Sequence, residues 1–403
     1  MRLKTCLLAA TCIAATSTPA LAAPGDPIAL DDDVTMDIIA NARLRYETVD
    51  QDNALENADA VTLRGRVGVE FAAKGFKLLA EGEGTVALAD DYNDTIPKNG
   101  VEPFSVVADP DSIELNRLQL SYSDDGFTGT FGRQRIILGN ARFVGNVGWR
   151  QNEQTFDAVR VQLGTGPFTA DASWAISQHT IFGSESPNRT FDGDFYLLNL
   201  RGDFDIVDVT AYSYTIDYDT RVAFSSQTFG LNASTELPLG TTKLNLSAGF
   251  ATQSDAGGNP TDYNADYYYA SAGTSYAGFT LSVNYEELGS DGGVAAFQTP
   301  LATLHAFQGW ADVFLTTPAA GVRDYYATLR KQFSVPGIGN VTAAVTYHDF
   351  DSDFGDVDYG SEWDASLGFS LGPIGLLAKY ANYDASNFAV DTEKFWIQAQ
   401  YSF

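Results

Sequence analysis

Strict alternation of apolar and polar residues runs through most of this chain. In the final segment, FWIQAQYSF (395–403), the odd positions are all aromatic or aliphatic, and the even positions are mostly polar. The same period of two recurs in 61–71, 279–286 and 341–348, whereas helical spacing of apolar residues is nowhere sustained. A period of two places alternate side chains on opposite faces of a strand. The pattern therefore predicts an all-β protein.

The alternating runs give an expected strand count. With strands of about ten residues, the chain contains about eighteen runs. We expect them to start near residues 36, 60, 76, 112, 126, 154, 167, 193, 205, 226, 240, 262, 278, 321, 340, 360, 373 and 392.

The connections between these runs alternate between long and short. Long polar segments include 89–111, 136–153 and 289–320, and tight turns include Lys74-Gly75 and Ala277-Gly278. A transmembrane antiparallel β-barrel has this asymmetry, with short periplasmic turns and longer extracellular loops. A soluble β-sandwich has no reason to alternate so regularly. We therefore predict a transmembrane barrel, and an even strand count places both of its ends on the periplasmic side.

The two ends of the chain agree with export to the cell outer membrane. Residues 1–22 combine a basic start, an apolar stretch and an Ala-Leu-Ala site, which is typical of a cleaved signal peptide. Both cysteines lie in this segment, so the mature chain has no thiol chemistry. We expect residues 23–35 to be a short periplasmic lead-in and 36–403 to form the barrel. The terminal Phe403 resembles the signal that the barrel assembly machinery recognises.

The composition is strongly acidic, with a formal net charge of −28. This charge argues against nucleic acid as a partner. Most acidic residues lie in the connections, where they are typically solvated or share divalent ions with lipopolysaccharide. We expect outer-membrane lipid and lipopolysaccharide as surroundings, no cofactor, and a monomer.

About half of the scarce basic residues occupy polar strand faces. Charge on a lipid face would cost about 2–4 kcal/mol at mid-membrane, so these side chains are expected to line a pore. Arg133 and Arg135 share a face with Phe131, so their direction is ambiguous. The expected pore-lining residues are Arg43, Arg45, Arg64, Arg66, Arg117, Arg133, Arg135, Arg160, Arg201, Lys243, Arg330, Lys379 and Lys394.

Two interpretations of these residues stay open. Arg43, Arg45, Arg64 and Arg66 could pair with nearby glutamates as a structural ladder. Alternatively, rings of basic residues line anion-selective pores. Arg117, Arg133, Arg135, Arg160 and Arg201 have fewer acidic neighbours at matching heights, which favours the pore interpretation for them.

Two long connections carry residues that could narrow a pore. The segment 132–160 reads GRQRIILGNARFVGNVGWRQNEQTFDAVR and mixes glycines with aromatic and cationic residues. Such a loop could fold inward as a constriction, or it could pack on itself as an external cap. The candidate constriction residues, including those of the connection 289–320, are Arg142, Phe143, Trp149, Arg150, His305 and Trp310.

These same stretches resemble the outer-membrane alginate export family. The similarity is strongest in 132–160 and in 297–325 (FQTPLATLHAFQGWADVFLTTPAAGVRDY), and weaker around Arg43, Arg45, Tyr46 and Glu47. The resemblance implies a channel of about eighteen strands. It also implies an arginine-rich lumen and outward passage of a polyuronate.

Other chemistry has little support in the sequence. None of the three histidines, His179, His305 and His348, is expected beside a hydroxyl and an acid on a lipid-facing surface, so no catalytic residues are assigned. Asp349, Asp351 and Asp353 have a calcium-loop spacing but no closing glutamate, which makes a weak metal candidate.

Three functions stay open. The leading one is a passive conduit for anionic solutes or a polyuronate such as alginate. The second is an uptake porin for carboxylates or small sugars. The third is a closed barrel that acts as an adhesin or anchor.

The aromatic pairs and triplets near strand ends, such as Tyr267-Tyr268-Tyr269, are expected in interfacial girdles.

Overall fold

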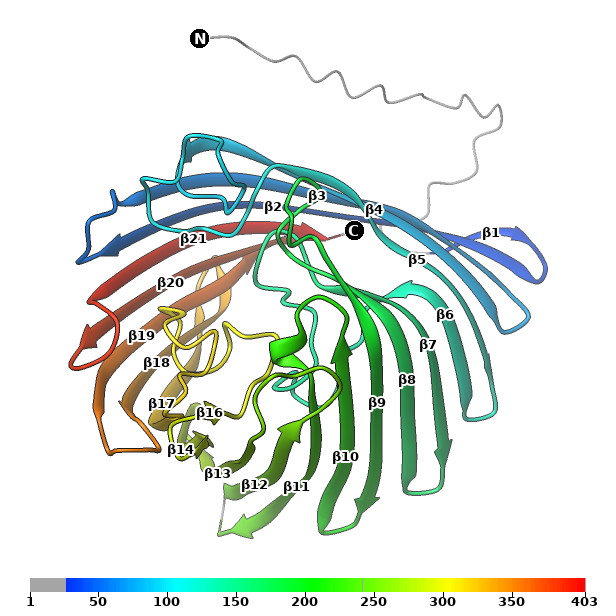
Figure 1. Ribbon diagram of the computed structural model, residues 1–403. Helices are drawn as coiled ribbons and strands as arrows, with labels where there is room; N and C mark the ends of the chain where they lie inside the picture. Colours follow the sequence, from blue (N-terminus) through cyan, green and yellow to red (C-terminus); the bar gives the residue numbers. More distant parts are fainter. Residues whose placement is uncertain (1–26, 241, 403) are drawn as a thin grey trace.

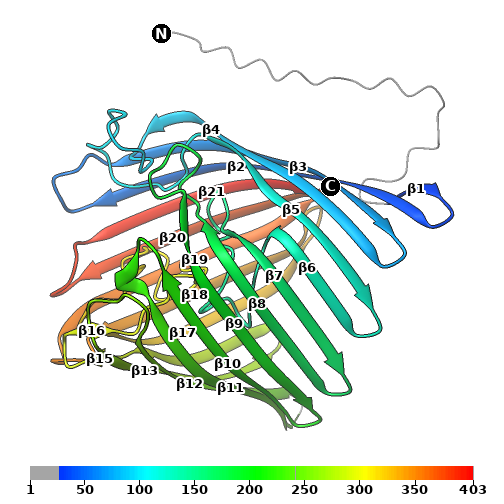
Figure 2. The same cartoon turned by 45° about the vertical axis from the view of Figure 1, so that its right-hand side comes forward.

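The chain forms one closed antiparallel barrel. A computed structural model describes residues 27–240 and 242–402. Nineteen strands belong to one sheet, and eighteen of them close into a barrel when β21 pairs with β2. Figures 1 and 2 show the strands surrounding an interior space, which we call the lumen. The predicted fold class is confirmed.

The strands agree closely with the predicted runs, because every predicted start lies within three residues of an observed one. The barrel strands are β2 (Val34–Gln51), β3 (Ala58–Ala73), β4 (Phe76–Asp91), β5 (Ser112–Asp124), β6 (Phe127–Gln134), β7 (Thr155–Thr165), β8 (Phe168–His179), β9 (Thr190–Phe204), β10 (Val207–Tyr218), β11 (Ser226–Leu239), β12 (Thr242–Asp255), β13 (Asn264–Tyr276), β14 (Phe279–Leu288), β17 (Val322–Val335), β18 (Gly339–Asp351), β19 (Asp358–Leu371), β20 (Ile374–Ala385) and β21 (Thr392–Ser402).

Shorter elements accompany the barrel. Strand β1 (Ile28–Asp31) pairs only with the start of β2, so part of the expected lead-in is a β-hairpin. Strands β15 (Ser290–Asp291) and β16 (Ala295–Ala296) form a small hairpin, and η1 (Val222–Phe224) is a 3₁₀ turn. No helix among the described residues is long and apolar enough to cross a membrane. The expected signal peptide and Phe403 lie outside the described residues.

Alternation along each strand separates two surfaces. On β2, Leu44 is 44% exposed on the outside, whereas the neighbouring Arg45 is 1% exposed on the lumen side. Outward apolar side chains suit lipid, and inward polar ones avoid the cost of charge in a bilayer. The largest cluster of buried residues lies in the lumen, where side chains of the connections 135–154 and 289–321 pack on the inner wall.

The aromatic triplet does not form the expected girdle. Tyr267 is buried at the lumen side, Tyr268 is 41% exposed on the outside, and Tyr269 again lies inward. A girdle interpretation fails here because successive strand residues point to opposite faces. Only the middle tyrosine of the triplet can reach lipid headgroups.

Gly360 is expected to be sensitive to substitution. Its φ is +108°, and a Cβ would overlap the carbonyl oxygen of Asp384 on the neighbouring strand. Gly360→Ala should lower the free energy of unfolding by about 1–3 kcal/mol, measured by urea titration in lipid vesicles. Gly337→Ala is the control, since its φ is +83° but a Cβ there meets no atom within 4 Å. Equal losses in both variants would contradict the steric argument.

Candidate functional site: two loops docked inside the barrel

Two loops fold into the lumen. The first inner loop (135–154) joins β6 to β7, and the second inner loop (289–321) joins β14 to β17. Figure 1 shows both within the ring of strands. They pair with each other, since the amide of Gly145 donates to the carbonyl of Leu301 at 2.8 Å and that of Thr303 to Ala141 at 3.0 Å. The prediction of inward-folding loops therefore matches the geometry, and an external cap does not.

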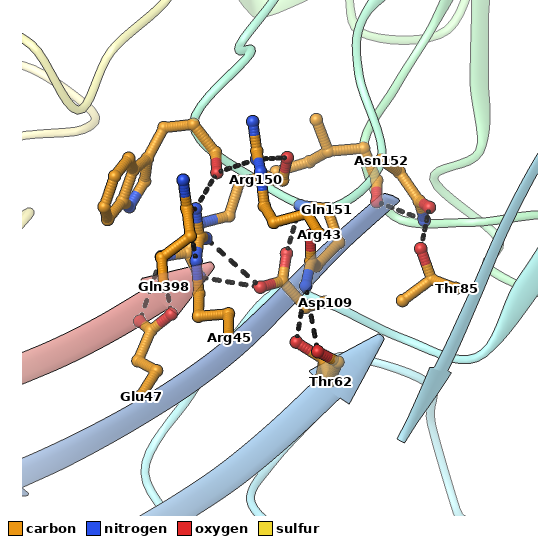
Figure 3. Close-up of polar contacts among 12 residues, drawn as sticks. Arg43, Arg45, Glu47, Thr62, Thr85, Asp109, Arg150, Gln151, Asn152 and Gln398 are labelled. Atoms are coloured by element: carbon orange, nitrogen blue, oxygen red, sulfur yellow. Dashed lines mark hydrogen bonds and ion pairs between the residues drawn. The ribbon is translucent and has the colours of Figure 1, made fainter. Parts of the chain in front are cut away.

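Arginines on β2 hold the first inner loop against the wall. Arg43 Nη1 donates to the carbonyl oxygens of Gly148, Trp149 and Arg150 at 2.9–3.2 Å. Arg45 Nη2 donates to the Trp149 carbonyl at 2.5 Å, and its guanidinium lies 4.0 Å from the centre of the Trp149 ring. These loop carbonyls have no strand partner, so the arginines satisfy them (Figure 3).

The next loop residues bind the same wall through a buried ion cluster. Arg150 donates to Glu47 at 2.9 Å and lies 3.8 Å from Asp109. Burial would lower the pKa of Arg150, but the two carboxylates outweigh it and raise the pKa above its ordinary value. Gln151 donates its amide to Asp109 at 2.7 Å and its side chain to Thr62 at 2.8 Å (Figure 3). The tip of the loop is thus fixed on β2 and β3.

Arg142 connects both inner loops to the opposite wall. It is 2% exposed and donates to Glu286 on β14 at 2.6 Å. It also donates to Thr299 at 3.2 Å and Gln308 at 3.0 Å, both in the second inner loop. A buried arginine with one carboxylate and two neutral acceptors is well satisfied, and removal of either charge would leave the other unpaired.

The second inner loop carries a hydrogen-bonded chain around His305. His305 Nδ1 donates to Asp312 at 2.8 Å, and Lys394 donates to the other oxygen of Asp312 at 3.0 Å. Lys379 donates to His305 Nε2 at 2.7 Å and lies 3.5 Å from the centre of the Trp310 ring. Burial lowers the pKa of His305 well below its ordinary value, against the opposing effect of Asp312. The loop is therefore held by a neutral imidazole.

Several predicted pore-lining arginines form ion pairs with carboxylates, although few acidic neighbours were expected for most of them. Arg117 donates to Glu81 at 2.8 Å, Arg135 to Glu153 at 2.6 Å, and Arg160 to Asp171 at 2.9 Å. Arg201 pairs with Asp208 at 2.7 Å. Arg66 pairs with Glu83, as the ladder interpretation allowed. For Arg117, Arg160 and Arg201 the expectation of few acidic neighbours failed because their partners lie on adjacent strands, whose register the sequence does not display. The partner of Arg135 belongs to the same inner loop. Lys243 on β12 likewise pairs with Glu236. Arg330 lies on β17 and is exposed.

Arg133 faces outward, contrary to the pore-lining prediction. It alternates with Gly132 and the buried Gln134 and donates to Asp157 at 2.8 and 3.0 Å. On this outer face His179 lies 2.9 Å from Asp157 and 3.1 Å from Thr190, so a histidine does sit beside an acid and a hydroxyl. Arg133 donates two hydrogen bonds to the Asp157 carboxylate. We therefore interpret the cluster as a structural contact that joins β6, β7, β8 and β9.

Three basic residues of the inner wall differ from the rest. Of the predicted pore-lining residues in the described chain, the buried Arg43, Arg64 and Lys379 and the exposed Arg330 have no carboxylate oxygen within 4 Å. Arg64 is 1% exposed, and its Nε and Nη1 have no hydrogen-bond acceptor within the described chain. These two enclosed donors are therefore unused within the described chain.

The calcium candidate is not supported. Within residues 27–240 and 242–402, no group of three acidic or histidine side chains could hold a metal ion. Asp349 and Asp351 lie in β18, whereas Asp353 follows the strand and is bound by the amide of Ser290 and by Arg323. An extended strand cannot wrap its side chains around one ion as a calcium loop does.

Several lumen residues were missed by the sequence analysis. Tyr212, Tyr214 and Tyr267 form an aromatic box around Phe143, with ring centres 5.0–6.3 Å from it. Asp109 and Asp312, which anchor the two loops, were also missed. The alternation of Tyr212 and Tyr214 on one strand face was a usable signal, and Asp312 lies in the segment 297–325 that resembles the alginate export family. Nothing in the sequence distinguishes Asp109 from other loop acids.

Several solved structures have a similar fold. OccK9 (OpdG) of Pseudomonas aeruginosa is 15% identical and gives a TM-score of 0.72 over 91% of this chain and 98% of that chain. OccAB4 of Acinetobacter baumannii is 13% identical, with a TM-score of 0.70 over 93% and 98%. OpdK of Pseudomonas aeruginosa with vanillate is 13% identical, with a TM-score of 0.69 over 91% and 98%. A comparison with curated proteins finds no match.

A closed barrel with an apolar outer surface and loops in a polar lumen defines an outer-membrane channel of the porin type. The family model for alginate export matches residues 34–275. The chain therefore belongs to the alginate export family, and it resides in the outer membrane.

Proposed function

We propose that this protein is a passive channel for anionic solutes whose passage depends on the unpaired basic residues Arg43, Arg64 and Lys379. The observation that carries the proposal is Arg64, a buried guanidinium with two unused donors beside the docked loop. A buried charge without a partner is costly, so a position that keeps one is suited to receive a charge of opposite sign. Carboxylates are the solutes that a guanidinium binds best in two-point geometry.

The favoured solute is a small carboxylate of the size of a single uronate. The two inner loops occupy the lumen and contact the wall on several sides, so an intact polyuronate such as alginate could pass only if they moved. One structural neighbour was solved with vanillate, an aromatic carboxylate. Uptake of small carboxylates therefore agrees better with this lumen than export of a polymer, and an anchor without conductance is the remaining alternative.

Neutralisation of Arg64 tests the proposal. In planar bilayers under a salt gradient, the wild-type channel should prefer anions, and Arg64→Gln should lower its anion-to-cation permeability ratio. A unit charge about 4 Å away contributes about 1 kcal/mol even at the dielectric constant of water, so we expect roughly a fivefold decrease. Arg64 makes no hydrogen bond to the inner loops in the described chain, so the variant should leave them docked.

Lys98→Gln is the matched control, because Lys98 is exposed in an external loop. It removes the same charge at a position screened by solvent. Cation preference in the wild type, or an equal change in both variants, would contradict a basic selectivity site. Absence of any conductance would instead favour an anchor.

A further inference from the structure

The wall opposite the basic residues contains two successive rows of side chains with the same layout. In the upper row, the strand register aligns Tyr212, Gly230, Ala251 and Tyr267 on β10 to β13. Tyr212 lies across Gly230, where a Cβ would overlap its ring. Phe143 of the first inner loop contacts both tyrosines, with ring centres 5.3 and 5.0 Å away. The protein thus fills its upper row with an aromatic ring of its own.

The lower row, one inward position closer to the short turns, aligns Thr210, Asn232, Gly249 and Tyr269. Asn232 lies across Gly249, as Tyr212 lies across Gly230. Within the described chain Phe143 packs on the tyrosines of the upper row, and no aromatic ring stacks on Tyr269 of the lower row. It borders a cavity of about 520 Å³ that is also lined by Arg142 and Phe143.

Several polar side chains that face this cavity have donors or acceptors without a hydrogen-bond partner in the described chain. The side chains of Thr210, Asn232 and Tyr269 make no hydrogen bond with the described residues, and all three are partly exposed. Asn199 accepts a hydrogen bond from Tyr214 at 2.6 Å, which leaves its amide donors free. The site therefore offers several neutral donors and acceptors beside one open aromatic ring.

Charges around the cavity are balanced, unlike those of the basic wall. Arg201 pairs with Asp208 at 2.7 Å, Asp171 is bound by Arg160 at 2.9 Å, and Arg142 is bound to Glu286 at 2.6 Å. A charged solute would gain no unpaired partner here. An uncharged ring with several hydroxyl groups would gain both stacking on tyrosine and hydrogen bonds to the amides.

We propose that the Thr210–Asn232–Tyr269 row is a binding site for neutral polyhydroxylated rings, such as sugars, separate from the basic selectivity site. The bound ring stacks on Tyr269 beside Asn232, as Phe143 packs against Tyr212 and Tyr267 in the upper row. Asn232 and Thr210 bind its hydroxyl groups, and Tyr269 covers one face. This site would allow the channel to hold a sugar without using Arg64.

Glucose is the probe for the test, used in equilibrium dialysis against the full-length mature barrel folded in detergent micelles. Saturable binding is expected for the wild type. Asn232→Leu and Tyr269→Leu should each weaken it by roughly five- to tenfold, the value of a hydrogen bond or a stacked ring. Gly249→Val should weaken it as well, because the added Cβ would overlap the Asn232 amide and displace it from the site.

Tyr268→Leu is the control, since Tyr268 is the neighbouring tyrosine on the outer face. It should bind glucose like the wild type. Absence of saturable glucose binding to the wild type, or equal weakening by Tyr268→Leu, would overturn the proposal. Binding that is lost in Arg64→Gln would also overturn it, because the sugar would then occupy the basic site. Dialysis requires no conductance, so failure of the anion-channel proposal would leave this result interpretable.

Discussion

Arg142→Met is expected to lower the free energy of unfolding by about 3–5 kcal/mol, the usual cost of breaking a buried ion pair. Methionine keeps most of the volume but leaves Glu286 charged and buried at 2% exposure, with only neutral partners. The change also removes the hydrogen bonds from Arg142 to Thr299 and Gln308 in the second inner loop. Urea titration in lipid vesicles, followed by tryptophan fluorescence, measures the loss.

The matched control is Arg201→Met, which breaks a pair whose arginine side chain is 51% exposed. Solvent screening limits such pairs to about 0–1 kcal/mol. The Arg142 variant should also show larger and noisier single-channel currents, because the inner loops lose their shared contact with β14. Equal stability losses in the two variants would refute the assigned role of Arg142.

Acidification should release the second inner loop through His305. Burial lowers the pKa of His305 below its ordinary value of about 6.5, so docking favours the neutral imidazole. Docking is therefore fully stable above pH 6.5 and weakens as the pH falls toward the lower pKa of the docked state. Each pH unit in that window costs about 1.4 kcal/mol. Protonation also places an N–H against Lys379, whose ammonium donates to the same nitrogen.

Channel conductance measured between pH 7 and pH 5 tests this prediction, with a rise expected toward pH 5. Asp312 does not titrate in the window, because its contacts with His305 and Lys394 outweigh burial and hold its pKa below the usual range. His305→Gln keeps an acceptor for Lys379 and a donor for Asp312, so its conductance should lose the added pH dependence. Any slope that persists in this variant belongs to titratable groups other than His305. An identical pH profile in both proteins would show that His305 does not control the loop.

The strand arrangement could be predicted because its cause is local. Each membrane strand meets lipid on one face and the lumen on the other, so the sequence itself alternates. Leu44 and Arg45 illustrate this, since one residue separates an outward from an inward side chain. The positions of the long loops followed from the same pattern, and so did the inward direction of most basic residues.

The pairing inside the lumen could not be predicted in the same way. Arg117 meets Glu81 from 36 positions away, and Arg142 meets Glu286 from 144 positions away. Such contacts depend on strand register and on the path of a loop across the barrel. Arg133 illustrates this limit. It was expected in the pore, but the strand pairing places it on the outer face, where it donates to Asp157.

The sequence by itself determined that this protein is a barrel with an apolar exterior and a polar interior, since the bilayer imposes that separation on every strand. Only the tertiary structure decided which interior charges cancel and which stay unpaired. That decision depends on distances between residues remote in the chain, and it leaves Arg43, Arg64 and Lys379 as the buried basic residues of the predicted set without a carboxylate partner in the described chain. It also revealed the charge-balanced row around Asn232 and Tyr269, because four adjacent strands must align before their side chains share one surface.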